Sequence, residues 1–235
     1  MCKWTRLLFL ALVAPHLTLA AWADPESSLD SNESSDLSSD SASDLTSGWT
    51  ADDLRFKIQA PYDVKSSDRY TFQDGAYHFW VMSTDQPFSK GNKTLPRTEM
   101  RFPDYTSGQH QYEADMMVPP GTDNVTIMQI HTGDADEHRY GPVAFMLQVH
   151  HGGNLYQGNR PPELMSNIYN KWFHLNVIND MTARKVLVYI DGKLVGTYKD
   201  PGAPSNYFKC GVYTCRGGSA KMEVYIKNIK IWHKD

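Results

Sequence analysis

Beyond its N-terminus, this chain of 235 residues has no hydrophobic run long enough to span a bilayer. The apolar run at residues 7–13 is also too short, but Lys3 and Arg6 precede it and small residues follow it up to Ala23. This layout is typical of a cleavable secretory signal. We therefore expect residues 1–23 to be a signal peptide, and the mature protein to be secreted, extracellular and without membrane contact.

Large apolar side chains are also scarce between residues 24 and 47, where Ser and Asp dominate and seven acidic residues occur without a basic one. Such a segment cannot bury enough apolar surface to offset the entropy of ordering it. We expect residues 24–47 to be a disordered linker, with a stalk or a propeptide as alternatives. Residues 48–235 are enough for one substantial core, so we expect a single domain there.

The expected domain has no excess of basic charge, since residues 48–235 contain 21 basic and 20 acidic residues. A nucleic-acid-binding domain of this size usually carries a basic stripe, and we therefore expect no nucleic-acid partner. An anionic ligand must instead be held by a few positioned cations in a cleft.

Cysteine is rare. Cys2 lies in the expected signal, so Cys210 and Cys215 remain. A pair in an exported protein favours a disulfide, which requires the chain to bend, because residues five apart in a straight strand point to opposite faces. Two buried thiols are the alternative. Three Asn-X-Ser/Thr sequons predict glycosylation in a eukaryote, at Asn32, Asn92 and Asn124.

No window of the domain sustains helical periodicity for three turns, whereas short β-branched and aromatic runs recur between turn residues. The clearest runs are residues 125–132, 143–150, 172–178, 185–190, 194–198, 207–213 and 222–232. The pattern predicts an all-β chain, and many antiparallel strands in one domain favour a jelly-roll sandwich of two sheets.

Two local features refine this prediction. Asp191-Gly192 stands between two alternating runs and predicts a tight hairpin, because both residue types tolerate positive φ angles. Near the C-terminus, the apolar positions change parity between Ile226 and Ile229. A β-bulge near Lys227-Asn228 would account for the change.

Three strand-like segments carry polar residues where apolar ones are usual. In the first, residues 97–101, Arg97, Glu99 and Arg101 share one face because side chains alternate along a strand. Two guanidiniums flanking a carboxylate form a site that can bind an anionic group, and the planar fork of Arg matches carboxylate oxygens. The alternative is a solvated face with a cross-strand ion pair.

The second segment presents Gln129, an amide donor, one pleat from His131, which can accept a proton. The third places Tyr207, Lys209 and Tyr213 on one face, where a nearby cation can lower the pKa of a phenol and enable proton transfer. Read separately, these segments also suit a structural histidine and ordinary half-buried tyrosines.

Together the three segments resemble the signature blocks of the alginate lyases called polysaccharide lyase family seven, which read approximately R-(T/S)-E-x-R, Q-(I/V)-H and Y-F-K-x-G-x-Y. All three occur in the family's order, and the resemblance extends from Trp49 to the end of the domain. It implies a β-jelly roll whose concave sheet forms a groove for an anionic uronic-acid polysaccharide. We expect no metal, no cofactor and a monomeric protein.

The resemblance also implies roles for individual residues. Arg97 and Gln129 correspond to groups that neutralise the uronate carboxylate, His131 to a base or neutraliser, and Tyr213 to the catalytic phenol. The remaining matched positions are substrate-binding ones, at Glu99, Arg101, Lys209 and Tyr207, and Glu99 also matches a residue that orients the arginines. The expected reaction is β-elimination, in which donors aimed at the carboxylate lower the barrier to removing the C5 proton.

Three other functions remain open. A glucuronan lyase would use the same mechanism on another uronan, and a lectin-like module would bind a uronan without cleaving it. A glycoside hydrolase needs two facing carboxylates, and the matched blocks contain only Glu99. The acidic stretch at residues 134–137 beside His131 and His138 matches no calcium or zinc motif, and we expect a loop bordering the groove.

Overall fold

The computed structural model describes residues 45–133 and 141–234. The expected signal peptide, most of the expected linker, Asn32 and the acidic stretch 134–137 lie outside these residues. The described part contains strands and one short 3₁₀ helix, η1 (Ser66–Asp68), so the all-β prediction is confirmed. Within it, no helix has the length and apolar character needed to cross a membrane.

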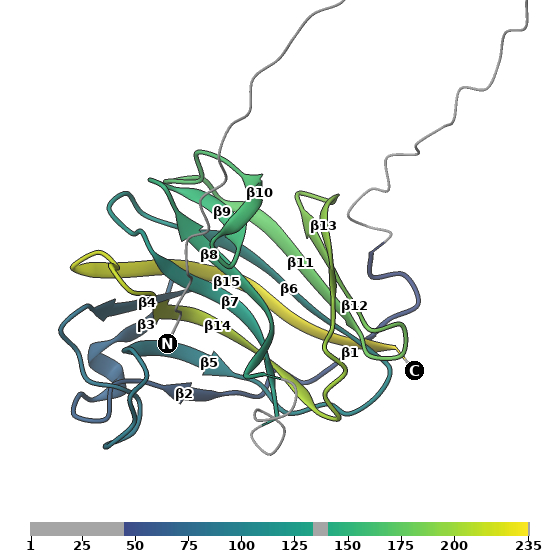
Figure 1. The fold of residues 1–235 in the computed structure, drawn as a ribbon, viewed down its shortest axis with the longest axis horizontal. Coiled ribbons are helices and arrows are strands. Elements are labelled where there is room, and N and C mark those ends of the chain that lie inside the picture. Colours follow the sequence, from purple (N-terminus) through teal and green to yellow (C-terminus); the bar gives the residue numbers. More distant parts are fainter. Residues whose placement is uncertain (1–44, 134–140, 235) are drawn as a thin grey trace, which may run out of the picture. The chain divides into compact units, whose positions relative to one another are not determined.

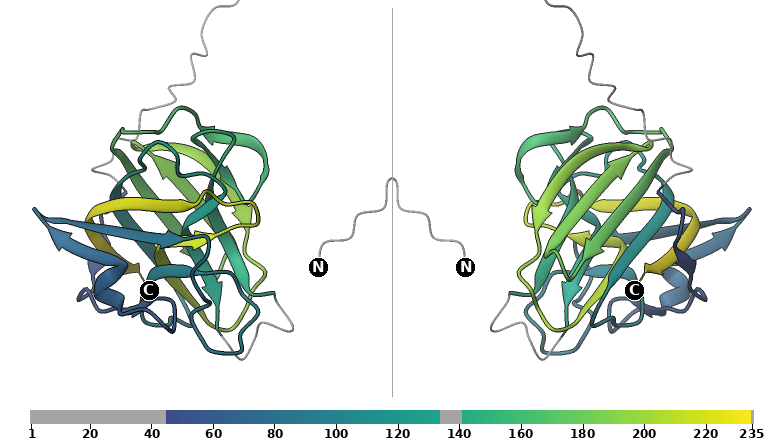
Figure 2. Two further views of the ribbon diagram at one scale, coloured as in Figure 1. Left: turned by 90° about the vertical axis from the view of Figure 1, so that its left-hand side faces the viewer. Right: turned by 90° about the vertical axis from the view of Figure 1, so that its right-hand side faces the viewer.

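The strands form two antiparallel sheets that face each other as layers (Figures 1 and 2). The eight-stranded sheet has the order β13-β12-β11-β6-β15-β4-β3, with β1 pairing to β15. Its strands are β1 (Thr50–Ala51), β3 (Tyr70–Gln73), β4 (Ala76–Met82), β6 (Gln109–Met117), β11 (Phe173–Asp180), β12 (Lys185–Ile190), β13 (Lys193–Lys199) and β15 (Lys221–Lys234).

The seven-stranded sheet has the order β10-β9-β8-β7-β14-β5-β2. Its strands are β2 (Lys57–Gln59), β5 (Arg97–Arg101), β7 (Val125–Thr132), β8 (Val143–His150), β9 (Asn154–Gln157), β10 (Arg160–Met165) and β14 (Asn206–Thr214). Strands far apart in the chain are therefore neighbours, because β14 lies between β5 and β7.

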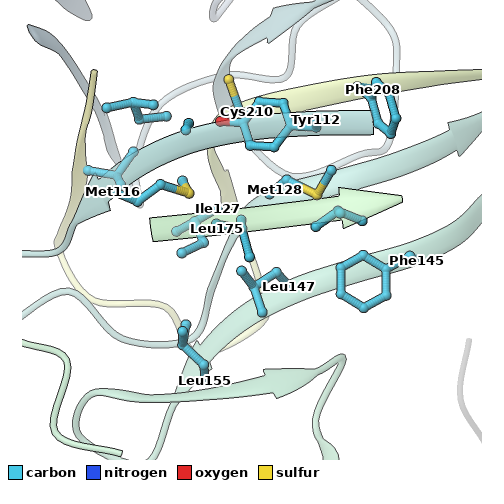
Figure 3. Packing of buried hydrophobic residues seen from close by; sticks show 14 of the residues in the cluster. Tyr112, Met116, Ile127, Met128, Phe145, Leu147, Leu155, Leu175, Phe208 and Cys210 are labelled. Carbon is cyan, nitrogen blue, oxygen red and sulfur yellow. The ribbon is translucent and has the colours of Figure 1, made fainter. Parts of the chain in front are cut away.

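The core lies between the two sheets and is formed by alternate residues of each strand. Phe208 and Val212 of β14 and Met128 of β7 are buried there, and Tyr112 and Met116 of β6 face them from the other sheet (Figure 3). Alternation sends the intervening residues of β14 and β7 to the outer face of the seven-stranded sheet. The polar residues singled out above occupy that outer face.

Both local predictions are confirmed. Asp191 and Gly192 adopt φ angles of 51° and 76° between β12 and β13, whose ends pair Ile190 with Lys193. The register of β15 against β6 shifts between Lys227 and Lys230, and Asn228 within the shift has a positive φ.

The disulfide prediction is wrong: both Cys210 and Cys215 are free thiols. The bend that a bridge requires does not occur, because β14 continues as a strand to Thr214. Cys210 therefore points into the core, where it lies beside Tyr112 (Figure 3), while Cys215 lies 3.7 Å from Oγ1 of Thr126. Burial raises the pKa of the Cys210 thiol to about 12, so it stays protonated.

Candidate active site

The three polar segments lie on three adjacent strands, with β14 in the middle. On one side, Lys209 pairs with Arg101 and Tyr213 with Arg97 of β5. On the other side, Lys209 pairs with Gln129 of β7, and Tyr207 pairs with His131. Pairing across the sheet therefore brings side chains from residues 97, 129 and 213 onto one surface.

A cavity of about 660 Å³ lies on this surface. Its floor is polar and comes from the predicted segments, namely Arg97, Gln129, His131, Tyr207, Lys209 and Tyr213. Its walls include apolar side chains from the chain before β5 and from the start of β8, namely Phe88, Pro142, Val143 and Met146. The volume is within the range of ligand sites in proteins, which is about 300–1,000 Å³.

Arg97 and Tyr213 are in direct contact. The Arg97 guanidinium carbon lies 4.0 Å from the centre of the Tyr213 ring, a cation–π geometry. Burial raises the pKa of Tyr213, although the positive charge of Arg97 acts in the opposite direction. The expected lowering of this pKa is therefore wrong for the free protein, and Tyr213 is a protonated phenol at neutral pH.

His131 has a defined tautomer. Its Nδ1 lies 2.8 Å from the Thr132 carbonyl oxygen, which can only accept a hydrogen bond. Nδ1 therefore carries the hydrogen, and in the neutral ring Nε2 has the lone pair that can take a proton. The ring stacks on Tyr207 with centroids 5.0 Å apart.

Arg101 lies on the far side of Tyr207 and is not among the residues that line the cavity. Its guanidinium carbon is 3.9 Å from the centre of the Tyr207 ring, and its Nη2 donates to Asp104 at 2.6 Å. Arg101, Tyr207 and His131 thus form a stacked row across three strands. In this position Arg101 supports the Tyr207 ring rather than facing the cavity.

Glu99 is fully buried beneath the floor. Its Oε1 accepts from Nε2 of Gln129 at 2.6 Å, and its Oε2 accepts from Nζ of Lys209 at 2.5 Å. Arg97 is more distant, with Nη1 at 3.6 Å from Oε2. Burial acts to raise the pKa of Glu99, but the charges of Lys209 and Arg97 outweigh it and the pKa is lowered.

Lys209 is buried as deeply as Glu99, with 1% of its surface exposed. Burial lowers its pKa to about 8, against the opposing attraction of Glu99. The alternative of a solvated face is therefore wrong, although a cross-strand ion pair does form, between Glu99 of β5 and Lys209 of β14. Arg97 and Glu99 belong to a buried group of four polar side chains that also includes Gln129 and Lys209.

Gly211 allows β14 to lie close to the part of β5 that carries Glu99. It pairs with Glu99 and lies on the same face as Lys209 and Tyr213. Because Gly211 has no side chain, β14 can approach β5 closely here: an added Cβ would lie 2.3 Å from the Thr98 carbonyl oxygen and 2.8 Å from the Glu99 Cα. Its φ of +132° is also one that other residues rarely adopt.

The register of β7 shifts beyond Gln129 against both of its neighbours. Between the pairs Cys210–Met128 and Tyr213–Thr126, β14 has the extra residue, since it contains two residues where β7 has only one. Against β8 the extra residue is Ile127 of β7, because Thr126 and Met128 pair with two consecutive residues of β8. Ile127 is buried in the core, and Thr126 pairs with Tyr213. The irregularity thus ends the row of groove-facing residues on β7 beyond Gln129.

Several cavity residues were not predicted from the sequence, namely Gln59, Phe88, Ser89, Asn92, Thr94 and Met146. They come from an edge strand, from the chain between β4 and β5, and from β8, and no motif distinguishes them. Asn92 was predicted only as a glycosylation site; it is exposed and its side-chain oxygen accepts from the Thr94 backbone. The other described sequon residue, Asn124, donates its Nδ2 to the Gly217 carbonyl.

Comparison with known proteins identifies the family. The family model described as alginate lyase matches residues 52–233. The citrate-binding protein of Hevea brasiliensis is 39% identical over 188 residues, which cover 77% of this chain and 74% of that protein.

Solved structures agree on the fold. The alginate lyase AlgAT5 from polysaccharide lyase family 7 superposes with a TM-score of 0.62 at 22% identity, covering 77% of this chain and 94% of its own. A variant of alginate lyase A1-II′ in complex with the substrate GGMG gives a TM-score of 0.58 at 14% identity, covering 76% and 92%. With a family model that matches most of its length and the jelly-roll fold of these enzymes, the chain belongs to the alginate lyase family.

Proposed function

We propose that the protein is a secreted polysaccharide lyase that cleaves a 1,4-linked uronic-acid polymer, most readily alginate, by β-elimination. The observation that carries this proposal is the meeting of Arg97, Gln129, His131 and Tyr213, from three strands, around one cavity. A sugar-binding module would need cations and aromatic surfaces. It would not need a proton acceptor and a protonated phenol beside them.

In the proposed reaction, Arg97 and Gln129 hold the carboxylate of one uronate. Removing the C5 proton places negative charge on that carboxylate, so donors already aimed at it stabilise the transition state. Nε2 of His131 takes the proton, the C5–H electrons form the C4–C5 double bond, and the C4–O bond breaks. Tyr213 then protonates the leaving glycosidic oxygen.

The protonation states divide the roles between His131 and Tyr213. A phenol with a raised pKa is a ready acid and a poor base, whereas the His131 tautomer leaves Nε2 free of hydrogen. Separate acid and base suit an elimination in which the C5 proton and the C4 oxygen lie on opposite faces of the ring. Guluronate has that arrangement, and we propose that guluronate-containing segments of alginate are preferred over mannuronate or glucuronan.

Citrate binding is the second candidate, since a relative 39% identical is named a citrate-binding protein. The cavity floor contains cations that could hold carboxylates. Among the described residues, however, Glu99 offsets one of the two charges of Arg97 and Lys209, and Asp104 offsets Arg101. One uncompensated positive charge matches a single uronate carboxylate better than a trianion.

The decisive experiment incubates the purified protein with alginate, glucuronan and pectate and follows the ultraviolet absorbance of the unsaturated uronate. Calorimetric titration with citrate runs in parallel. Rising absorbance with alginate supports the lyase. Constant absorbance with every uronan, accompanied by tight citrate binding, favours the second candidate, and uronan binding without a rise favours a lectin-like module.

Tyr213→Phe tests the mechanism, because it removes one hydroxyl and little volume. We expect turnover to fall about 10²–10⁴-fold, the usual contribution of a positioned general acid. Alginate binding and thermal unfolding should stay close to those of the unchanged protein. Tyr225→Phe, on the outer face of the eight-stranded sheet, is the matched control and should keep full turnover. Full turnover in Tyr213→Phe would remove the phenol from the mechanism.

A further inference from the structure

We propose that Glu99 is a positioning residue that locks the side-chain amide of Gln129 in the orientation needed to receive a uronate carboxylate, and that Lys209 is its buried counter-charge rather than a substrate contact. This inference rests on the proposed lyase function. It assigns separate tasks to two residues that the family resemblance places together in the substrate-binding set.

The first step concerns the orientation of Gln129. A carboxylate can only accept hydrogen bonds, so Glu99 requires Gln129 to present its nitrogen and not its oxygen. One N–H of Gln129 is then used by Glu99, and the second remains to donate to the cavity that Gln129 lines. If the amide were reversed, its oxygen would face the substrate carboxylate and repel it.

The second step concerns the burial of this contact. Glu99 and Gln129 are 0% and 1% exposed, so water does not compete for their hydrogen bond. The bond joins β5 to β7 across β14 and therefore fixes the amide to the centre of the sheet. Catalytic groups must be held this closely, because a misplacement of about 1 Å can cost about 10²-fold in rate.

The third step concerns charge. Lys209 directs Nζ to the buried carboxylate of Glu99, so the two opposite charges offset each other within the protein. Arg97 lies 3.6 Å from Glu99, beyond a good hydrogen bond, and instead stacks on Tyr213. The Glu99–Lys209 pair therefore leaves the guanidinium of Arg97 as the uncompensated cation of the floor.

Orientation and charge can be separated by three variants. Glu99→Gln keeps the shape but can donate or accept, so it no longer locks Gln129, and it adds net positive charge to the floor. Lys209→Met keeps the lock but makes the floor neutral. The double variant Glu99→Gln/Lys209→Met restores the original net charge without restoring the lock.

Steady-state kinetics on alginate give the first readout. We expect Glu99→Gln to lower kcat about 10²-fold without raising KM. Lys209→Met should mainly raise KM, and the double variant should return KM to its original value while kcat stays low. Recovery of kcat in the double variant, or an unchanged kcat in Glu99→Gln, would overturn the positioning role.

A second readout does not depend on turnover. The hydrogen-bonded side-chain N–H of Gln129, assigned from its loss in Gln129→Ala, should exchange slowly with solvent in ¹H–¹⁵N spectra. This protection should vanish in Glu99→Gln and persist in Lys209→Met, and urea unfolding checks that each variant is folded. If the unchanged protein cleaves no uronan, the proposed function fails, whereas unprotected Gln129 in a folded protein refutes the positioning role itself.

Discussion

Gly211 offers the sharpest test of how the site is built. An alanine Cβ at this position would lie 2.3 Å from the Thr98 carbonyl oxygen and 2.8 Å from the Glu99 Cα. Both are backbone atoms of β5, so neither can move aside by changing a rotamer. The φ of +132° adds a second obstacle, because it lies outside the regions open to L-residues with a side chain.

The two obstacles give an expected magnitude for Gly211→Ala. A residue held in an unfavourable backbone region costs about 1–3 kcal/mol, and an overpacked contact that shifts the backbone costs about 1–3 kcal/mol more. We therefore expect the free energy of unfolding to fall by about 2–6 kcal/mol. Gly217 is the matched control: its φ is +76°, but an added Cβ would have no neighbour within 4 Å. Gly217→Ala should cost only about 1–2 kcal/mol.

Urea denaturation of both variants is the assay, read as the change in midpoint at constant slope. If the two variants lose the same stability, the close approach of β14 to β5 is not what requires glycine at position 211. The close approach of β14 to β5 at Gly211 also sets the distance between the site residues on these two strands. Moving β5 away from β14 would separate Arg97 from Tyr213, so any folded Gly211→Ala protein should also lose turnover, whereas Gly217→Ala should keep it.

Two further predictions concern the two thiols and the buried ion pair of Glu99 and Lys209. Denaturation without a reducing agent should allow alkylation of both Cys210 and Cys215, because neither is bonded to the other; a mass that shows only unmodified cysteines would restore the disulfide. The second follows from the pKa of Lys209, which is lowered from 10.5 to about 8. Between these values the unfolded chain binds more protons at this residue than the folded one, so its contribution to the free energy of unfolding rises with pH from about 8 to 10.5. The difference between the unchanged protein and Lys209→Met should show this rise, and a difference that is flat across the window would contradict the assignment.

Much of the fold could be predicted from the sequence where strands have strong β signals. The bounds of β7, β8 and β12 agree with their predicted runs, since each is rich in Val, Ile or Leu between clear turns. β6 was not predicted, because residues 109–117 contain no β-branched residue, although Tyr112, Ala114 and Met116 alternate with polar residues as in a half-buried strand. Its register between β11 and β15 comes from packing with strands distant in the sequence.

The polar residues of the cavity floor could be predicted from the sequence, but their geometry and the other lining residues could not. Alternation within a strand places Arg97, Glu99 and Arg101 on one face, yet it cannot show that Glu99 is buried and that Arg101 stands behind Tyr207. Those facts depend on which strands are neighbours. The expected bend between Cys210 and Cys215 failed for the same reason, because pairing with β5 keeps β14 extended.

The position of β14 between β5 and β7 has a consequence for when the candidate site can form during synthesis. Arg97 of β5 and Gln129 of β7 are synthesised well before β14, which lies between these two strands. In a nascent chain that stops before Asn206, the edges of β5 and β7 that pair with β14 therefore have no partner strand. Neither edge can be completed locally, because the missing partner is a long-range one. If the proposed lyase activity is present, cleavage of a uronan begins only after β14 has paired with β5 and β7. The time at which turnover appears would then measure how late this pairing occurs in folding.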